Sequence, residues 1–262
     1  MRVYAAIADL TAGTRAWRFW TMLGWNDIKQ RYRRTFIGPF WITISMTVMI
    51  LSLGTIYGSI FQMAISKYMI YLAAGIVSWF FLSTTMLEGM SAFVAAEGII
   101  KQSPIPFTIY IYRVIWRNII VLLHNIVVVA VMFPLFSSFS PILPLAFVAG
   151  LVIMVGNLFI ISLILALLST RFRDLPPIMT SVVQILFYVT PVLYETSQLP
   201  ARLKLIAHYN PFYHIIDVLR RPMIGDLPEA ASYGVSIGAL LIGGVVAFVL
   251  FQRFRARIPY WL

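Results

Sequence analysis

Long apolar segments separated by short polar ones form the main pattern along this chain. The longest, residues 118–170, holds 53 positions without an Asp, Glu, Lys or Arg. A helix that crosses a bilayer needs about 20 apolar residues at a rise of ~1.5 Å each. Residues 118–170 are therefore long enough for two crossings. A short polar stretch from Ser137 to Pro141 lies near the middle and predicts the turn of a helical hairpin.

The same criterion predicts six membrane-spanning helices. Their ranges are Pro39 to Phe61, Met69 to Leu87, Asn118 to Phe136, Leu143 to Leu168, Pro176 to Tyr194 and Gly234 to Phe251. Composition agrees, because 61% of residues are hydrophobic and 11% are charged, against about 25% charged in soluble domains. The fold class is therefore all-α, a polytopic membrane protein. We expect an N-terminal cytoplasmic part, residues 1–36, and a six-helix transmembrane domain, residues 37–262.

Basic residues are distributed unevenly between the two sides that these spans define. With the N-terminus inside, the predicted cytoplasmic segments carry 15 of the 20 Lys and Arg residues, and the outer segments carry 5. Short positively charged loops resist translocation, so both termini are predicted to be cytoplasmic. The net charge of +11 then reflects this bias and an attraction to anionic headgroups of membrane lipids. Nucleic acid is not an expected partner.

Residues 14–35 mix tryptophans with basic side chains and lack an apolar run of spanning length. Tryptophan rings favour headgroup depth, while Lys and Arg reach phosphate and water. The segment therefore predicts a helix that lies in the membrane interface. Two interpretations stay open, a topological anchor alone or an element that also receives a lipid-linked substrate.

The second predicted loop, residues 93–117, contains Pro104 and Pro106. A residue before proline is pushed away from helical geometry, and proline lacks an amide hydrogen, so a helix is expected to stop near Ser103. The result is a short cytoplasmic helix and a turn, either a plain connector or a docking element for a cytoplasmic partner. The candidate docking residues are Glu97, Lys101, Gln102 and Pro104.

Residues 193–234 alternate apolar runs with charges and contain four prolines. The runs are too short to cross a bilayer and too apolar for an ordinary outer loop, which favours short re-entrant or surface-lying helices. Such helices would place a lid at the outer mouth. The candidate residues of this outer gate are Tyr194, Tyr209, Asn210, Pro211 and Phe212.

Four segments together resemble a known family. They are DIKQRYRRTFIGPFW (27–41), IIKQSPIP (99–106), RFRDL (171–175) and NPFYHIIDVLRRPMIG (210–225). They look like the permease subunits of ATP-binding-cassette transporters that export O-antigen, capsule or teichoic-acid polymers, and the resemblance covers almost the whole chain. It implies a homodimer in the bacterial cytoplasmic (inner) membrane, two separate nucleotide-binding ATPase subunits and a lipid-linked polysaccharide as substrate. The family's Leu-Gly step before the first span is Ile37-Gly38 here.

This resemblance assigns two sets of site residues. Arginine forks pair well with phosphate oxygens, so the candidates for the phosphate of a lipid carrier are Arg31, Arg33, Arg34 and, at the family's glycine step, Gly38. Aromatic rings offer loose contact to sugar faces, although aromatic belts at membrane interfaces are also common. The candidate pathway residues are Tyr57, Phe61, Tyr71, Trp79, Phe81 and Tyr188.

Chemistry on the chain itself is not predicted. The sequence has no G-x-x-x-x-G-K-[ST] phosphate loop, so ATP and Mg²⁺ are expected on the partner subunit and no cofactor on this chain. It has no cysteine, and its three histidines fall at different depths or sides, so neither a metal site nor catalytic residues are expected. Two alternatives stay open: an exporter of a drug or small lipid, and a polytopic membrane transferase.

Overall fold

The structure is a computed structural model that describes residues 2–33, 38, 40–60, 62–136, 142–196 and 200–262, except the side chain at position 203. The described residues form helices joined by short turns and contain no β-strand. The predicted all-α class of polytopic membrane protein is confirmed.

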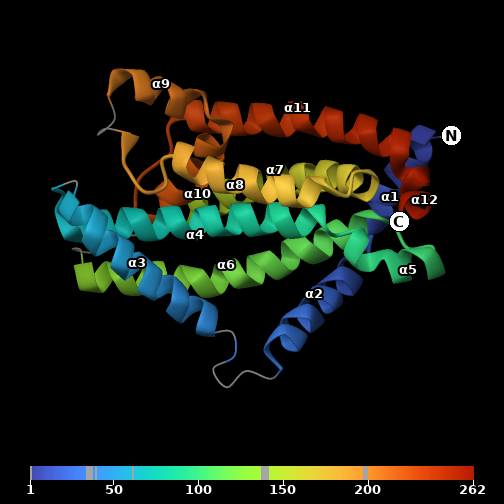
Figure 1. The fold of residues 1–262 in the computed structure, drawn as a ribbon, viewed down its shortest axis with the longest axis horizontal. Helices are drawn as coiled ribbons and strands as arrows, with labels where there is room; N and C mark the ends of the chain where they lie inside the picture. Colours follow the sequence, from blue (N-terminus) through green and yellow to red (C-terminus); the bar gives the residue numbers. More distant parts are fainter. Residues whose placement is uncertain (1, 34–37, 39, 61, 137–141, 197–199) are drawn as a thin grey trace.

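Five helices in the described part are long and apolar enough to cross a membrane. They are α3 (Phe40–Ile60), α4 (Ile65–Met90), α6 (Thr108–Phe136), α7 (Pro144–Arg171) and α11 (Ala230–Phe254) together with its short continuation to Trp261. Four of them, α4, α6, α7 and α11, run along the long axis of the molecule (Figure 1). Both termini lie at one end, which we call the terminal end, and α9 and α10 lie at the other, the distal end.

The fifth predicted span is shorter than expected. Helix α8 (Leu175–Val189) has 15 residues, or about 22 Å of rise, against the ~30 Å of a bilayer's hydrocarbon core. It ends because Thr190 precedes Pro191 and adopts extended geometry. The predicted end at Tyr194 was therefore wrong, and the chain turns back after α8.

Helix α4 forms the centre of the bundle, because α3, α6, α7, α8 and α10 all pack against it. Most of its apolar stretch is buried, 83%, against 17% for α3 and for α11. Helices α3 and α11 instead expose large apolar side chains, such as Trp41 and Ile242. Apolar faces without a protein partner are what a membrane-embedded helix presents to lipid.

The predicted short helices at the distal end are present as α9 (Ala201–Tyr209) and α10 (Pro211–Met223). Helix α10 packs between α4, α7 and α11. Gly150 of α7 lets α10 come this close, because a Cβ there would lie 1.9 Å from the carbonyl oxygen of Val218. The backbones of α7 and α10 are thus in direct contact, and α10 is a core element.

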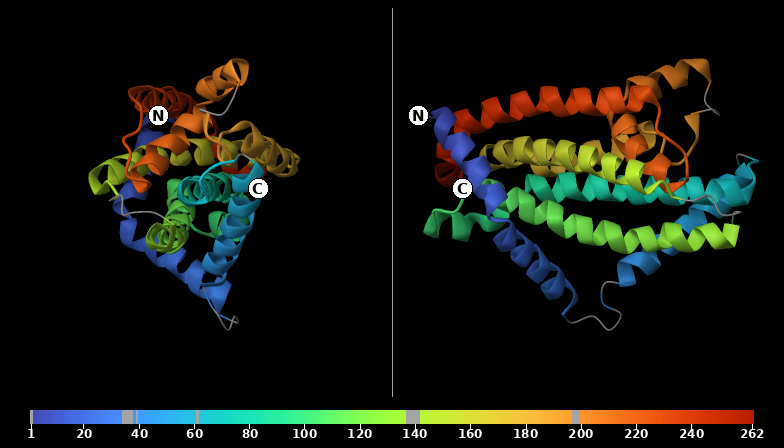
Figure 2. Two further views of the ribbon diagram at one scale, coloured as in Figure 1. Left: turned by 90° about the vertical axis from the view of Figure 1, so that its left-hand side faces the viewer. Right: turned by 180° about the vertical axis from the view of Figure 1, so that it is seen from behind.

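The interfacial helix predicted over residues 14–35 corresponds to α2 (Trp17–Tyr32), and a separate helix, α1 (Arg2–Arg15), precedes it with a break at Ala16. Helix α2 packs along α6, where the ring of Trp20 stacks on that of Tyr112 at 5.5 Å. In Figures 1 and 2, α2 slants away from the bundle at the terminal end, and α3 approaches the same side from the distal end.

Asp9 attaches α1 to the rest of the bundle. Its carboxylate, 2% exposed, accepts hydrogen bonds from the backbone amides of Phe107 and Thr108 and from Nε of Arg255. The two amides are unpaired donors at the start of α6. A carboxylate here completes the cap and suits the positive end of the helix dipole.

The loop after α4 forms η1 (Val94–Ala96) and α5 (Glu97–Gln102). The predicted stop at Ser103 is confirmed, because this residue is extended. Helix α6 begins at Thr108 rather than at the predicted Asn118, so Arg113 and Arg117 lie on a helix and not in a loop. At the C-terminal end, η3 (Arg255–Arg257) and α12 (Ile258–Trp261) continue from α11.

Candidate functional site

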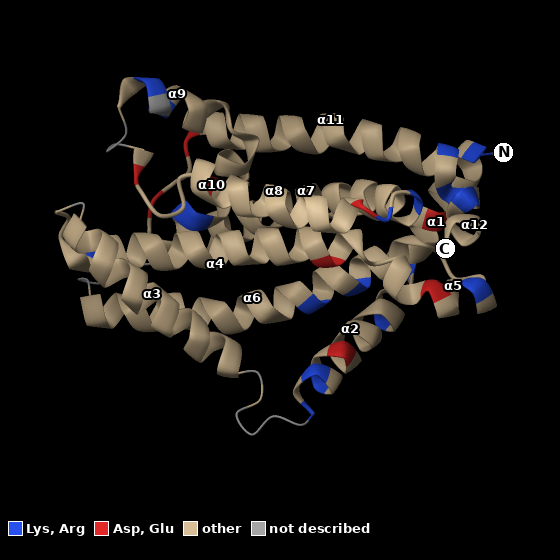
Figure 3. Cartoon of the chain, viewed as in Figure 1, with Lys and Arg blue, Asp and Glu red and all other residues tan. Residues whose placement is uncertain are grey.

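Charged residues gather toward the two ends of the bundle and along α2, and long stretches of the apolar helices carry none (Figure 3). Ions are costly inside hydrocarbon and tend to be paired or functional where they occur. The charged clusters at each end are therefore the first places to look for a site.

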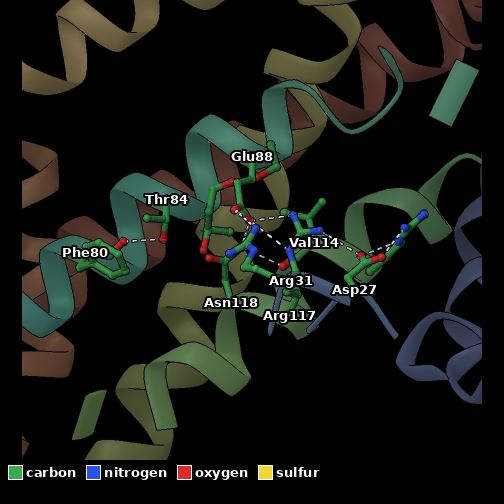
Figure 4. A network of polar contacts seen from close by, with 11 residues as sticks. Asp27, Arg31, Phe80, Thr84, Glu88, Val114, Arg117 and Asn118 are labelled. Atoms are coloured by element: carbon green, nitrogen blue, oxygen red, sulfur yellow. Dashed lines mark hydrogen bonds and ion pairs between the residues drawn. The ribbon is translucent and has the colours of Figure 1, made fainter. Parts of the chain in front are cut away.

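An ion network joins α2, α4 and α6 on the terminal side (Figure 4). Glu88 of α4 accepts hydrogen bonds from Nη2 of Arg31 at 2.9 Å, Nη2 of Arg117 at 2.7 Å and Nδ2 of Asn118 at 2.7 Å. Arg117 also donates to Asp27 of α2 at 2.9 Å. Arg113 forms a two-pronged pair with the same Asp27 carboxylate. We call these six residues the α2–α4–α6 network.

The α2–α4–α6 network holds two carboxylates against three guanidinium groups. Arg117 bridges both carboxylates and is 16% exposed, and Asp27 is 13% exposed. Removing one partner of a largely buried pair leaves a charge without compensation. The network therefore connects the slanting α2 firmly to the central α4 and to α6. The sequence did not reveal it, since its partners lie up to 90 positions apart.

The predicted phosphate residues fall near this network. Arg31 is paired with Glu88, and its pKa is raised: burial acts to lower it, but the hydrogen bond and charge of Glu88 outweigh burial. Arg33 is exposed at the end of α2, and Arg34 lies outside the described residues. Gly38 has a φ of +61°, a left-handed conformation that glycine adopts without steric cost. A phosphate role for this set stays a prediction.

The four predicted docking residues lie together on α5 and the turn after it. Lys101, Gln102 and Pro104 are exposed, and Glu97 is half-buried. Nζ of Lys101 donates to Oε1 of Glu97 at 2.6 Å, and this bond and charge lower the pKa of Glu97. The structure thus brings the set to one surface at the terminal end. Docking itself stays a prediction.

A second charged cluster lies at the distal end, and its buried charged members, Asp217 and Arg220, were not among the predicted site residues. Asp217 of α10 is 0% exposed and accepts from Nη2 of Arg220 at 2.9 Å, Nε of Arg221 at 3.2 Å and Oγ of Ser232 at 2.9 Å. Nη1 of Arg220 donates to the hydroxyl of Tyr71 at 2.6 Å. It also donates to the carbonyl of Pro191 at 2.8 Å.

This distal cluster ties α10 to α4 and to the turn after α8. The Arg220 guanidinium lies 4.5 Å from the centre of the Tyr71 ring, a cation–π contact. Burial acts to lower the pKa of Arg220, but its interactions with Tyr71 and with the Asp217 carboxylate outweigh burial and raise the pKa. One signal could have identified the pair. Asp217 and Arg220 are three positions apart in α10, the spacing at which side chains meet on a helix.

The predicted gate residues mainly shape the start of α10. Asn210 caps this helix, because its Oδ1 accepts from the amide of Phe212 at 2.9 Å, and Pro211 takes the first helical position, where proline is favoured. The hydroxyl of Tyr194 donates to the carbonyl of Tyr188 at 3.0 Å. Tyr209 is exposed on α9. These contacts give the set a structural role, and gating stays a prediction.

The predicted pathway residues do not share one surface of the protomer. Trp79 and Phe81 lie in the buried core around α4, and Tyr71 belongs to the distal cluster. Tyr57 is half-buried on α3 and Tyr188 is exposed on α8. Phe61 lies outside the described residues. Their role as a lining stays a prediction. Among the described residues, no group of three His, Asp or Glu side chains is placed to hold a metal ion.

A cavity of about 650 Å³ opens beside the distal cluster. Helices α4, α6 and α10 and the segment after α8 contribute to its wall. Its lining residues are Ser66, Lys67, Ile70, Tyr71, Phe133, Phe136, Glu195, Thr196, Tyr213, Arg220, Arg221, Ile224 and Asp226. We call it the distal cavity.

Comparison with known proteins gives a consistent result across most of the chain. A family model described as "ABC-2 type transporter" matches residues 18–224. An O-antigen export system permease protein of Klebsiella pneumoniae is 25% identical over 236 residues, covering 88% of this chain and 90% of that protein. A polysialic acid transport protein of Escherichia coli is 20% identical over 238 residues, again covering 88% and 90%. A further O-antigen export permease, from Myxococcus xanthus, is 22% identical and covers 66% of each chain.

Proposed function

This chain belongs to the ABC-2 type transporter family, and we propose that it is the membrane subunit of an exporter that moves a lipid-linked polysaccharide outward across the bacterial cytoplasmic membrane. The observation that carries the proposal is the similarity over 88% of the chain to permeases named for O-antigen and polysialic acid export. The all-helical membrane fold agrees with this role. ATP hydrolysis is assigned to separate nucleotide-binding subunits, and two copies of this chain form the permease.

A movement of the nucleotide-binding subunits would be transmitted to the membrane helices through α5. This helix connects α4 to α6 through η1 and the turn at Ser103, so a displacement of α5 acts on both helices. The α2–α4–α6 network ties α2 to the same two helices through Asp27 and Glu88. We propose that a nucleotide-binding subunit docks on Glu97, Lys101, Gln102 and Pro104 and shifts these three helices together.

The lipid carrier would meet the basic end of α2. Arg31 and Arg33 lie in the last turn of α2 and just after it, and guanidinium groups suit phosphate oxygens. Arg31 would exchange part of its contact with Glu88 for a phosphate. This exchange would couple arrival of the carrier to the α2–α4–α6 network.

The pathway would form between two protomers. Tyr57 is half-buried on α3 and Tyr188 is exposed on α8, so a second copy could bring such residues to a shared surface. Aromatic rings there would contact successive sugars without holding one of them. Replacing both with Ala should reduce export, whereas Phe at both positions should preserve it.

Complementation tests the proposed function. A bacterial strain that lacks its own polysaccharide permease receives this chain with the nucleotide-binding subunit from the same gene neighbourhood, and surface polymer is measured. Polymer should appear only when both proteins are present, and the chain alone should hydrolyse no ATP above background. Robust hydrolysis by the purified chain, or no polymer from the complete pair, would contradict the proposal.

A matched pair of charge reversals tests docking. Lys101→Glu should reduce export and ATP hydrolysis while leaving membrane abundance unchanged. Lys204→Glu makes the same charge change on exposed α9 at the distal end and should leave hydrolysis intact. Equal effects of the two variants would remove the docking assignment.

Single cysteines test the orientation, because the natural chain has none. Cysteine at Lys67 or Lys204 should react with an impermeant thiol reagent from outside intact cells. Cysteine at Gln102 or Arg173 should react only after the inner face is exposed. The reverse pattern would invert the proposed topology.

A further inference from the structure

The distal cavity has the size and position of a binding site, and of the predicted pathway residues that the structure describes it contains Tyr71. Its volume of about 650 Å³ lies within the range of small-molecule sites, roughly 300 to 1,000 Å³. It lies at the opposite end of the molecule from α5 and both termini (Figure 1). A ligand there would be far from the proposed docking surface.

One part of its wall is aromatic. Tyr71, Phe133, Phe136 and Tyr213 all line the cavity. The rings of Tyr71 and Tyr213 also flank the Arg220 guanidinium, at 4.5 and 5.8 Å from their centres, which holds both rings in place. Fixed aromatic faces suit a flat, weakly polar surface such as the C–H face of a sugar ring, because ring burial stabilises the complex without directional bonds.

The rest of the wall supplies both hydrogen-bond donors and acceptors. Ser66 and Lys67 can donate, and Glu195 and Asp226 can accept. Arg220 lines the same wall, but its Nη atoms already donate to Tyr71, to the carbonyl of Pro191 and to Asp217, and its Nε is buried. The donors that a ligand can reach are therefore those of Ser66 and Lys67.

The charges around the cavity nearly cancel. Lys67, Arg220 and Arg221 are opposed by Glu195 and Asp226 in the wall and by two carboxylates paired with the arginines, Asp217 and Glu229. A surplus of positive charge would favour an anion, and a purely apolar wall would favour a lipid tail. Balanced donors and acceptors beside aromatic faces instead match hydroxyl groups, which both donate and accept.

We propose that the distal cavity binds one neutral, hydroxyl-rich sugar unit of the exported polymer, a subsite within the protomer rather than between two protomers. The proposal rests on the proposed function, because export supplies the sugar chain. The sugar face lies on the aromatic wall, and its hydroxyls bond to Asp226 and Lys67. Such a subsite would hold the exported polymer at the distal end between successive rounds of ATP hydrolysis.

Sugar binding to the purified full chain in lipid nanodiscs tests the proposal. The probes are methyl α-D-mannopyranoside, methyl β-D-galactopyranoside and N-acetylglucosamine, with glucuronic acid as an anionic comparison, and saturation-transfer NMR measures each Kd. Two variants change the cavity, Phe136→Ala and Asp226→Asn. Two matched controls make the same kinds of change at exposed terminal-end positions, Tyr260→Ala and Asp174→Asn.

We expect saturable binding of at least one neutral sugar, a Kd at least tenfold higher in both cavity variants, and unchanged values in both controls. No saturable binding, equal Kd values in all proteins, or preference for glucuronic acid would overturn the proposal. Surface polymer separates the two ideas. Normal export by a chain that binds no sugar refutes the cavity subsite alone, whereas sugar binding without polymer export refutes the assignment to an exported chain.

Discussion

Replacing Asp217 with Ala tests the physical role of the distal cluster most directly. Asp217 and Arg220 are almost fully buried, at 0% and 2% exposure. They pair within α10, and Arg220 also donates to Tyr71 of α4 and to the carbonyl of Pro191. Removing the carboxylate leaves the guanidinium buried without its counter-ion. It also removes the acceptor used by Arg221 and Ser232.

The loss of unfolding free energy expected for Asp217→Ala follows from these contacts. Breaking a buried ion pair on one side costs about 3–5 kcal/mol. Arg220 keeps its bonds to Tyr71 and Pro191 and its contact with the Tyr71 ring, which places the expected loss at the lower end, about 3 kcal/mol. That loss lowers the ratio of folded to unfolded protein roughly 100-fold, since ~1.4 kcal/mol is a factor of ten.

Equilibrium unfolding in mixed detergent micelles, followed by far-UV circular dichroism, measures this free energy. The double variant Asp217→Ala with Arg220→Met removes the uncompensated charge and should recover about 2 kcal/mol or more of the loss. As a control, Glu229→Gln breaks only the more exposed pair with Arg221 and should cost less than about 1 kcal/mol. The reasoning is refuted if Asp217→Ala costs no more than Glu229→Gln, or if the double variant recovers nothing.

Two further predictions concern single positions. Gly150→Ala should separate α7 from α10 and cost about 2 kcal/mol or more in the same unfolding assay, because the new Cβ meets the carbonyl oxygen of Val218. Gly238→Ala, with nothing within 4 Å, should be neutral or slightly stabilising, and equal losses would contradict the packing argument. In α5, the lowered pKa of Glu97 means that its pair with Lys101 contributes fully above the ordinary carboxyl pKa and is lost as pH falls through the lowered value. Carbon-13 NMR of the carboxyl should show this pKa returning upward in Lys101→Ala, and an unchanged value would exclude the pair as its cause.

The membrane fold could be predicted from the sequence because its cause is local. Each long helix contains a run of apolar residues of bilayer length, and a proline just beyond a helix marks where that helix ends. The stop at Ser103 before Pro104 was predicted correctly for this reason, and the same rule explains why α8 ends before Pro191. The start of α6 at Thr108 was missed, because charged Arg113 and Arg117 end an apolar run without ending a helix.

The candidate sites could be predicted only in part. The docking residues lie within eight positions of one another, so their shared surface on α5 and the turn after it followed from position in the chain. The pathway residues were chosen by residue type, and an aromatic residue type does not determine whether a side chain is buried in the protomer. Phe81 is buried in the protomer core, and Tyr188 is exposed. Which residues face a second protomer depends on how the helices are rotated, and rotation is set by packing against neighbours.

The sequence by itself determined the class of protein, the approximate spans and the resemblance to a transporter family, because apolar length, proline positions and motif order are properties of the chain in one dimension. Only the tertiary structure decided that α4 is the central helix, that Asp9 caps a helix almost 100 positions away, and that Asp217 and Arg220 meet Tyr71 beside a cavity. The physical reason is that burying a charge requires partners on every side. In a helical bundle those partners come from helices that are distant in sequence and adjacent in space.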